Sequence, residues 1–326
     1  MTVRTCTKVN IGLNILRRRP DGYHDLETLF VPYYGFGDTL TVEPADHISI
    51  LIDFGGAQPW DPQKDLTLQA WRLLKADFPA LPEVSIRLEK HSPVGAGLGG
   101  GSADAAFMLR ALNGIGGLGL SDSRLAAYAA KLGSDCAFFI YNSPMYATGR
   151  GEVLEPFDID LSAYELLVEI PLDAVTGLPV AVSTREAYSE VIPRENEISR
   201  LRPKGSARND TTVSPGHASS AMRTPSVMRT PSAMRTPSVM RTPSAMRTPS
   251  VISSETKWSR EISLKEALRL PVERWKDTVV NDFEKGVFAK HPEIAALKRK
   301  FYDDGAIYAA MSGSGSAVFG LFPKID

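Results

Sequence analysis

Apolar and polar residues alternate near the N-terminus, which predicts a strand. Every second position over residues 9–15 is Val, Ile or Leu, and the positions between them are Asn or Gly. A two-residue period of this kind is typical of a half-buried strand with one polar face. Lys8 and Asn10 lie on that polar face and therefore point the same way.

A strand, a glycine-rich loop and a helix follow one another in the middle of the chain. Residues 84–88 alternate again, a glycine run comes next, and residues 105–112 carry apolar side chains at helical spacing. A further helix is predicted between Ser121, a preferred N-cap residue, and Gly133, of a type that often follows a helix end. Asp135 comes almost immediately after that helix.

The C-terminal part also mixes helix and strand signals. Helices are predicted over residues 264–270 and 279–289, and a third opens at Pro292. The chain then reads as a strand over residues 307–311, a tight Ser/Gly turn and a second strand over residues 317–322. The pattern as a whole indicates a protein of mixed α and β structure.

One segment shows neither the two-residue period of a strand nor the spacing of a helix. From Met222 the chain runs through five copies of a six-residue unit, MRTPSV or MRTPSA. A proline in every unit forbids a continuous helix, and the unit offers too little apolar surface for a core. We interpret residues 203–257 as a disordered insertion. The alternative is a functional tether that is phosphorylated or binds an acidic partner, and loss of activity on deleting the segment would favour it.

Composition excludes wholesale disorder and separates this insertion from the rest. Of the 326 residues, 43% are hydrophobic and 23% are charged, and the formal net charge is −1. Residues 203–257 hold eight of the 37 Lys and Arg and two of the 38 Asp and Glu, which leaves 29 basic and 36 acidic residues elsewhere. The rest of the chain therefore lacks the basic footprint of a protein that binds nucleic acid or an anionic membrane.

The chain shows no pattern of a secreted or membrane protein. No apolar stretch follows the N-terminal Arg, and no window approaches the roughly 18 apolar residues of a membrane span. We therefore expect a cytoplasmic protein with no nucleic-acid and no membrane partner. Cys6 and Cys136 lack a second Cys or a His at ligand spacing, so both are expected to be free thiols, and no protein metal site is predicted.

The strongest local signal is a loop with five glycines among seven residues. Glycine permits left-handed backbone angles that let successive N–H groups converge, and the following helix adds its positive N-terminal end. Such a loop suits a phosphate group better than a merely tight connection between strand and helix. The loop consists of Pro93, Val94, Gly95, Ala96, Gly97, Leu98, Gly99, Gly100, Gly101, Ser102 and Ala103.

Two common phosphate loops fit this segment poorly. Gly95, Gly97 and Gly100 satisfy Gly-x-Gly-x-x-Gly, but the acidic residue that a dinucleotide fold needs about 20 residues later would fall at a helix start. A P-loop is excluded because no Gly-Lys-Ser/Thr follows the glycines. Ser102 can still place a hydroxyl near a phosphate or Mg²⁺.

Three segments together resemble the motifs of the GHMP kinases, the superfamily of galactokinase, homoserine kinase and mevalonate kinase. The glycine loop resembles their phosphate loop, Lys-Val-Asn-Ile-Gly-Leu at residues 8–13 resembles the first motif, and Met-Ser-Gly-Ser-Gly-Ser at residues 311–316 resembles the third. Within the superfamily, four further segments resemble the kinases of 4-diphosphocytidyl-2-C-methyl-D-erythritol. They are residues 19–30, 132–135, 182–188 and 281–284.

The resemblance covers essentially the whole chain outside residues 203–257 and implies a fold. That fold is α+β, a two-domain GHMP kinase with a ferredoxin-like C-terminal domain. Residues 1–160 would form the domain that carries the phosphate loop and the catalytic residues, and residues 161–326, interrupted by the insertion, would form the second. ATP and its acceptor would meet in the cleft between them.

The resemblance also implies a reaction, in which ATP with Mg²⁺ phosphorylates the 2-hydroxyl of the cytidine-linked substrate, a step in making isoprenoid precursors without mevalonate. Lys8 would place positive charge between the acceptor hydroxyl and the γ-phosphate, and Asp135 would orient the hydroxyl or accept its proton. Orientation with late proton transfer is favoured because an ordinary aspartate is a weak base. Asn10 would lie beside Lys8 on the acceptor side.

Recognition of the cytosine is assigned to three residues by the same resemblance. Tyr23 would stack on the base, His24 would hydrogen-bond to it, and Tyr188 would close its other face. One departure concerns the nucleotide, because Asp65 stands where the family commonly has Asn, which puts adenine contacts there in doubt. We expect a small-molecule substrate and a monomer or weak homodimer.

Other interpretations remain open on the sequence alone. Lys8 could be an exposed strand lysine, Asp135 a helix cap, and Tyr23 and His24 a surface pair. The chain could be another small-molecule GHMP kinase, acting on mevalonate or homoserine. It could also be an inactive binding protein on this fold, or a scaffold whose function lies in the repeats.

Overall fold

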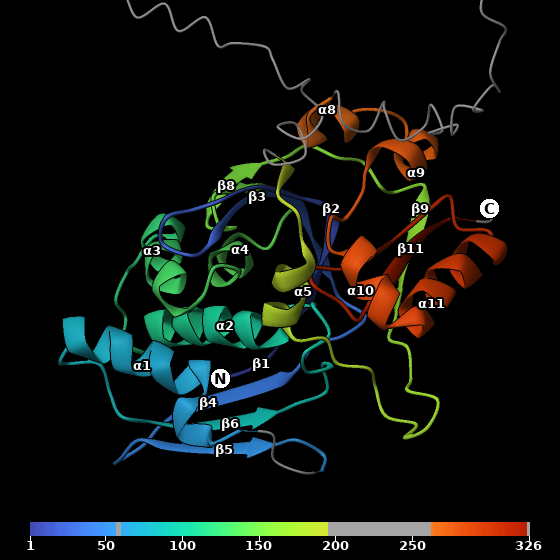
Figure 1. The fold of residues 1–326 in the computed structure, drawn as a ribbon. Coiled ribbons are helices and arrows are strands. Elements are labelled where there is room, and N and C mark those ends of the chain that lie inside the picture. The colour runs from blue at the N-terminus through green and yellow to red at the C-terminus, as the bar shows by residue number, and fades with distance from the viewer. Residues whose placement is uncertain (57–59, 195–261, 325–326) are drawn as a thin grey trace, which may run out of the picture.

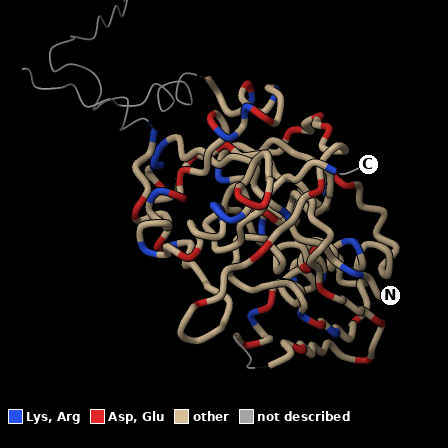
Figure 2. Tube along the Cα trace, turned by 90° about the vertical axis from the view of Figure 1, so that its right-hand side faces the viewer, with Lys and Arg blue, Asp and Glu red and all other residues tan. Residues whose placement is uncertain are grey.

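A computed structural model describes residues 1–56, 60–194 and 262–324. The segment 203–257, interpreted above as a disordered insertion, lies outside the described residues. Within the described part the α+β class is confirmed, with helices and three sheets. Lys and Arg are scattered among Asp and Glu along the trace rather than collected on one face (Figure 2). No described helix is long and apolar enough to cross a membrane.

The first sheet carries the N-terminal motif. It is antiparallel, in the order β2-β3-β7-β8, and its strands are β2 (Thr7–Arg18), β3 (His24–Tyr33), β7 (Met145–Thr148) and β8 (Val153–Pro156). The register of β2 against β3 shifts after Ile11, next to Gly12, whose φ is +68°. A Cβ on Gly12 would lie 2.5 Å from the side chain of Leu264, so glycine is needed there for space as well.

The expectation that this strand is half-buried is wrong, because β2 is buried on both faces from Thr7 to Ile15. Val9 and Ile11 pack with Phe319 of the C-terminal part. The polar face is covered as well, so Lys8 is only 3% exposed. The alternation of apolar and polar residues correctly separates the two faces of β2. It cannot show that other parts of the chain cover the polar face.

A second sheet and four helices form the largest core. The sheet has the order β1-β4-β6-β5, with β5 parallel to β6 and the other pairs antiparallel. Its strands are β1 (Thr2–Arg4), β4 (Thr39–Pro44), β5 (Ser49–Asp53) and β6 (Val84–Glu89). The helices are α1 (Leu66–Asp77), which follows the short helix η1 (Pro62–Lys64), α2 (Gly100–Ile115), α3 (Asp122–Leu132) and α4 (Cys136–Tyr141).

Helix α2 lies between this sheet and the first one (Figure 1). Ala103, Ala105 and Ala106, which lie around the start of this helix, are all fully buried, and their small side chains allow the neighbouring elements to approach closely. The sequence prediction for α3 is confirmed at both ends: Ser121 accepts a hydrogen bond from the Arg124 backbone N–H, and Gly133 is the C-cap residue.

The C-terminal part contains a three-stranded antiparallel sheet in the order β10-β11-β9. The strands are β9 (Tyr164–Glu169), β10 (Tyr308–Met311) and β11 (Val318–Pro323). The predicted boundary at residue 160 falls between β8 and β9, which belong to different sheets. The helices in this part are α5 (Thr184–Glu190), α8 (Leu264–Ala267), η2 (Val272–Arg274), α9 (Trp275–Thr278), α10 (Glu284–Lys290) and α11 (Pro292–Asp303).

The predicted helix over residues 279–289 is wrong in its first half. Asn281 forms an isolated parallel bridge with Leu13 of β2: the Leu13 backbone N–H donates to the Val280 carbonyl, and the Asp282 N–H donates to the Leu13 carbonyl, both at 2.8 Å. These hydrogen bonds to a distant strand replace the helical ones, so α10 begins only at Glu284. The helix opened by Pro292 and the two terminal strands are confirmed.

Candidate functional site

Lys8 is a buried cation that contacts three different parts of the site. Its Nζ lies 3.4 Å from Asp135 Oδ2, donates to Asn10 Oδ1 at 2.5 Å and donates to the Gly97 carbonyl at 2.8 Å. Burial lowers the pKa of Lys8, and the charge of Asp135 opposes that shift. These contacts exclude the interpretation of Lys8 as an exposed strand lysine.

Asp135 occupies the N-cap position of α4, but its side chain makes no capping hydrogen bond. The carboxylate accepts a hydrogen bond from Ser134 Oγ at 3.3 Å and the side chain is 29% exposed. The simple helix-cap interpretation is therefore not supported. The next residue, Cys136, is a buried free thiol, and burial raises its pKa to about 12, so it is protonated at neutral pH.

The glycine loop has the backbone expected of an anion site. Gly95, Gly97 and Gly99 all have left-handed φ angles between +74° and +77°. Helix α2 then begins at Gly100 with no side chain capping its N-terminus, so its first N–H groups are free of a side-chain partner. A Cβ on Gly101 would meet nothing within 4 Å. The loop therefore presents open backbone donors at a helix start.

The Ser/Gly turn of the third motif is tied to this loop. Ser312 Oγ donates to the Gly97 carbonyl at 3.2 Å and accepts from the Asn10 backbone N–H at 3.2 Å. The buried Asn281 stabilises the turn, because its Nδ2 donates to the carbonyls of Met311 and Gly313, both at 2.8 Å. The 281–284 segment thus supports the turn.

The predicted substrate residues line one cavity, together with both predicted catalytic residues. Its volume is about 920 Å³, within the range of small-molecule sites. Its lining includes Lys8, Asn10, Tyr23, His24, Asp135 and Tyr188. The structure therefore brings together residues that lie up to 180 positions apart in the chain.

The three predicted cytosine-binding residues, Tyr23, His24 and Tyr188, do not form an open slot for a base. The rings of His24 and Tyr188 stack on each other, with centroids 4.9 Å apart and planes 19° apart. Tyr23 is 57% exposed, and the Arg150 guanidinium lies 4.9 Å from its ring centroid. His24 thus already covers one face of Tyr188, which sequence reasoning did not anticipate.

Three cationic side chains on the cavity wall were missed by sequence reasoning. They are Lys131, Arg150 and Arg185. Arg150 stands between two glycines with positive φ, and this Gly-Arg-Gly turn was the signal that could have found it. Arg185 lies inside the 182–188 segment but was not singled out from it.

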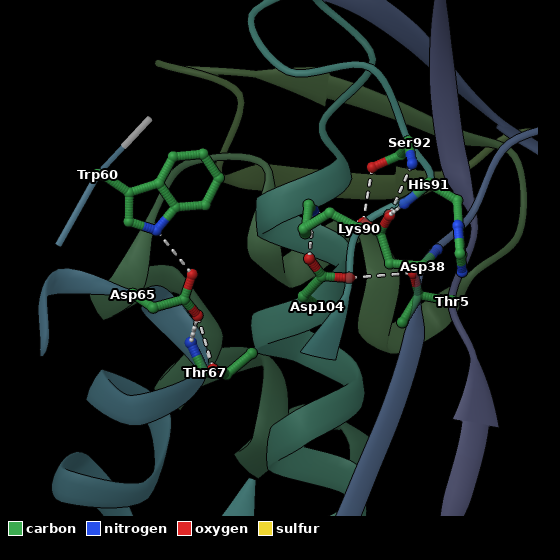
Figure 3. Close-up of polar contacts among 9 residues, drawn as sticks. All are labelled: Thr5, Asp38, Trp60, Asp65, Thr67, Lys90, His91, Ser92 and Asp104. Atoms are coloured by element: carbon green, nitrogen blue, oxygen red, sulfur yellow. Dashed lines mark hydrogen bonds and ion pairs between the residues drawn. The ribbon is translucent and has the colours of Figure 1, made fainter. Parts of the chain in front are cut away.

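Asp65, whose adenine contacts were in doubt on the sequence, has a structural role. It is the N-cap of α1, and its Oδ1 accepts hydrogen bonds from the Thr67 backbone N–H and hydroxyl (Figure 3). Its Oδ2 accepts from Trp60 Nε1 at 3.1 Å. An aspartate is well suited to this position because its carboxylate accepts all three bonds.

Two family models match two separate parts of the chain. Residues 65–143 match the GHMP kinases N-terminal domain and residues 263–326 match the GHMP kinases C-terminal domain. The 4-diphosphocytidyl-2-C-methyl-D-erythritol kinase of Bacteroides fragilis is 40% identical over 97% of this chain and 89% of its own length. The chain belongs to this kinase family.

Two further comparisons agree with that membership. The 4-diphosphocytidyl-2-C-methyl-D-erythritol kinase of Parabacteroides distasonis is 38% identical over 97% of this chain and 90% of its own length. A crystal structure of 4-(cytidine 5'-diphospho)-2C-methyl-D-erythritol kinase has a TM-score of 0.63 and 27% identity, and covers 98% of this chain and 90% of that one. A homoserine kinase from Cytophaga hutchinsonii, TM-score 0.60 at 13% identity, shares the fold.

Proposed function

We propose that this protein transfers the γ-phosphoryl group of ATP to the 2-hydroxyl of 4-diphosphocytidyl-2-C-methyl-D-erythritol. The observation that carries the proposal is the position of Lys8 Nζ, which contacts the Gly97 carbonyl of the phosphate loop and the Asp135 carboxylate of the cavity. The buried Lys8 ammonium therefore lies between the phosphate loop, which would bind the triphosphate, and the cavity, which would bind the acceptor. Phosphoryl transfer requires that proximity above all.

The residues divide the work between charge and position. Residues 93–103 hold the triphosphate with backbone N–H groups, and Lys8 balances negative charge that moves from the γ-phosphate toward the leaving group. Asp135, with no capping bond to satisfy, orients the 2-hydroxyl and takes its proton late in the transfer. Asn10, held by Lys8 and by Thr28 Oγ1 at 3.0 Å, fixes the acceptor side.

Mg²⁺ would enter with the nucleotide. Among the described residues no group of three or more His, Cys, Asp or Glu has the arrangement of a metal site. The oxygen donors that fit the ion are phosphate oxygens together with the Ser102 hydroxyl at the start of α2. The ion would neutralise charge on the triphosphate, as in other phosphoryl transfers.

The lining of the cavity also fits the cytidine diphosphate group. Lys131, Arg150 and Arg185 supply positive charge for the diphosphate, and Tyr23 offers an exposed ring for stacking. Burial and the charge of Arg18 lower the pKa of His24, so its imidazole is neutral at neutral pH. A neutral imidazole can both donate and accept, which matches the edge of cytosine.

A substrate panel tests the proposal directly. Purified protein with Mg-ATP is offered 4-diphosphocytidyl-2-C-methyl-D-erythritol, mevalonate and homoserine in parallel, and phosphorylated product is measured. We expect turnover of the cytidine-linked substrate alone. We also expect a monomer or weak homodimer in which one chain forms each site. Turnover of mevalonate or homoserine instead would favour the other kinases of this fold, and no turnover of the first would overturn the proposal.

Replacing Tyr188 by alanine is expected to raise KM for the cytidine substrate about 5- to 150-fold, because stacking of a base on an aromatic ring contributes roughly 1–3 kcal/mol. KM for ATP should stay unchanged, since Tyr188 lies in the acceptor cavity. The matched variant Tyr188→Phe keeps the ring, and steady-state kinetics should place it near the wild type. Equal KM values in Tyr188→Ala and Tyr188→Phe would contradict the stacking role.

A further inference from the structure

A buried ionic network of Lys90, Asp38 and Asp104 lies apart from the residues that line the acceptor cavity, and Figure 3 shows its contacts. Lys90 forms ion pairs with Asp38 and, at 2.7 Å, with Asp104. The exposed fractions of the three side chains are 4%, 0% and 2%. One cation thus serves two carboxylates in the protein interior, an arrangement that costs desolvation free energy and is weak evidence for stability alone.

Asp38 fixes the residues that lead into the loop. Its Oδ1 accepts the backbone N–H groups of His91 and Ser92, both at 2.6 Å, and its Oδ2 accepts from Ser92 Oγ at 2.6 Å and from Lys90. Burial opposes ionisation of Asp38, but Lys90 and these hydrogen bonds outweigh it and hold its pKa below the usual range. Ser92 directly precedes Pro93, where the loop begins.

Asp104 fixes the other end of the loop. It is the fifth residue of α2, and its Oδ2 accepts from Lys90. The start of α2 also rests on the network, because a Cβ on Gly100 would lie 2.4 Å from Ser92 Oγ. Both ends of residues 93–103 are therefore held by one set of buried charges.

Thr5 extends the network toward Lys8. Its hydroxyl donates to Asp104 Oδ1 at 3.0 Å and accepts the Asp38 backbone N–H at 2.9 Å. The Thr5 backbone N–H donates to the Asp38 carbonyl at 2.8 Å. Thr5 precedes Lys8 by three residues, so the network connects the loop to the start of the strand that carries the central cation.

We propose that the Lys90–Asp38–Asp104 network positions the phosphate loop for ATP, so that these residues are positioning residues for the nucleotide and not for the acceptor. The inference rests on the proposed function, in which residues 93–103 hold the triphosphate. None of the three residues lines the acceptor cavity. Disturbing the network should therefore change ATP binding much more than binding of the cytidine substrate.

Asp38→Asn is the variant that should show this most clearly. The asparagine amide would have to point its NH₂ either at the two backbone N–H groups or at the side of Lys90 and Ser92, and the N–H groups and Lys90 can only donate. We expect KM for ATP to rise at least about tenfold, because hydrogen bonds to a charged group are among the stronger ones. KM for the cytidine substrate should stay within about twofold, since its cavity is untouched.

Asp104→Asn is the matched variant. Burial raises the pKa of Asp104 to about 7, while Lys90 opposes that shift, so losing the charge of Asp104 should disturb the network less than losing that of Asp38. The amide oxygen can still accept from Lys90, and Asp38 keeps its ion pair and its backbone hydrogen bonds, so we expect the ATP KM to rise less than in Asp38→Asn. Ser92→Ala removes one hydroxyl bond to Asp38 and keeps the ion pairs, so it should fold and raise the ATP KM about threefold.

A control separates positioning from general destabilisation. Asn113, also in α2, exchanges two hydrogen bonds with the Leu120 backbone at 3.0 and 2.9 Å, away from the loop. Asn113→Ala should lower Tm without changing the ATP KM. Selective ATP effects in Asp38→Asn and Ser92→Ala, with none in Asn113→Ala, would support the proposal. It is overturned if Ser92→Ala and any folded Asp38→Asn lower Tm but leave the ATP KM unchanged.

The design also separates this inference from the proposed function. Equilibrium binding of ATP, measured by calorimetry without any acceptor, gives Kd for each variant. If the wild type binds ATP but turns over no cytidine substrate, the proposed function fails while the network is still tested by these Kd values. If the wild type turns over the cytidine substrate and all variants bind ATP with the same Kd, the network proposal is overturned and the proposed function is not.

Discussion

Replacing Asp135 by asparagine, or Lys8 by methionine, is expected to lower kcat about 10³-fold, because each removes a group placed at the reacting centre. The asparagine cannot take the hydroxyl proton. The methionine removes a cation that contacts both Gly97 and Asp135. Steady-state assays with Mg-ATP and the cytidine substrate measure the loss.

Neither change should unfold the protein, which makes the loss of kcat interpretable. Met has a length similar to that of Lys, and the partner left behind, Asp135, is 29% exposed, so water can solvate its carboxylate after the change. The Asp135 side chain caps no helix N–H group. Asp122→Asn, at an exposed residue paired with Arg110, serves as a control and should keep full activity. A kcat near that of the wild type in a folded Lys8→Met or Asp135→Asn would remove the catalytic assignment.

Features set by neighbouring residues could be predicted from the sequence. The N-cap at Ser121, the glycines of the loop and the proline that opens α11 act through their own backbone and the next turn. The alternation in β2 likewise placed Lys8 and Asn10 on one face, and the structure joins them by a hydrogen bond of 2.5 Å. The resemblance to a kinase family added the roles, which pattern alone does not contain.

Features set by distant pairing could not be predicted. Residues 280–282 carry a helical pattern, yet they pair with Leu13 across the sheet because tertiary hydrogen bonds outweigh a weak local preference. The same limit hides the network of Lys90, Asp38 and Asp104, whose members lie up to 66 positions apart. Lys90 shows no periodic or motif signal, and only burial beside two carboxylates reveals its role.

Gly97→Ala is expected to be the most damaging single change in the phosphate loop. The φ of Gly97 is +77°, and holding an L-residue in the left-handed region costs roughly 1–2 kcal/mol. A Cβ there would also lie 2.3 Å from the Ser312 carbonyl oxygen and 3.0 Å from that of Gly315. The turn cannot move away freely, because Asn281 holds it from behind. The Gly97 carbonyl that receives Lys8 must therefore shift.

We expect Gly97→Ala to lower Tm by several degrees and kcat/KM for ATP by at least about a hundredfold, since stability and loop geometry suffer together. Gly101→Ala separates the two effects. Its Cβ would meet no protein atom within 4 Å, so Tm should hold, while a methyl group at the helix start would crowd the phosphate and raise the ATP KM. Gly114→Ala, also without contacts and far along α2, should change neither. An unchanged ATP KM in both Gly97→Ala and Gly101→Ala would mean that the loop does not hold the triphosphate.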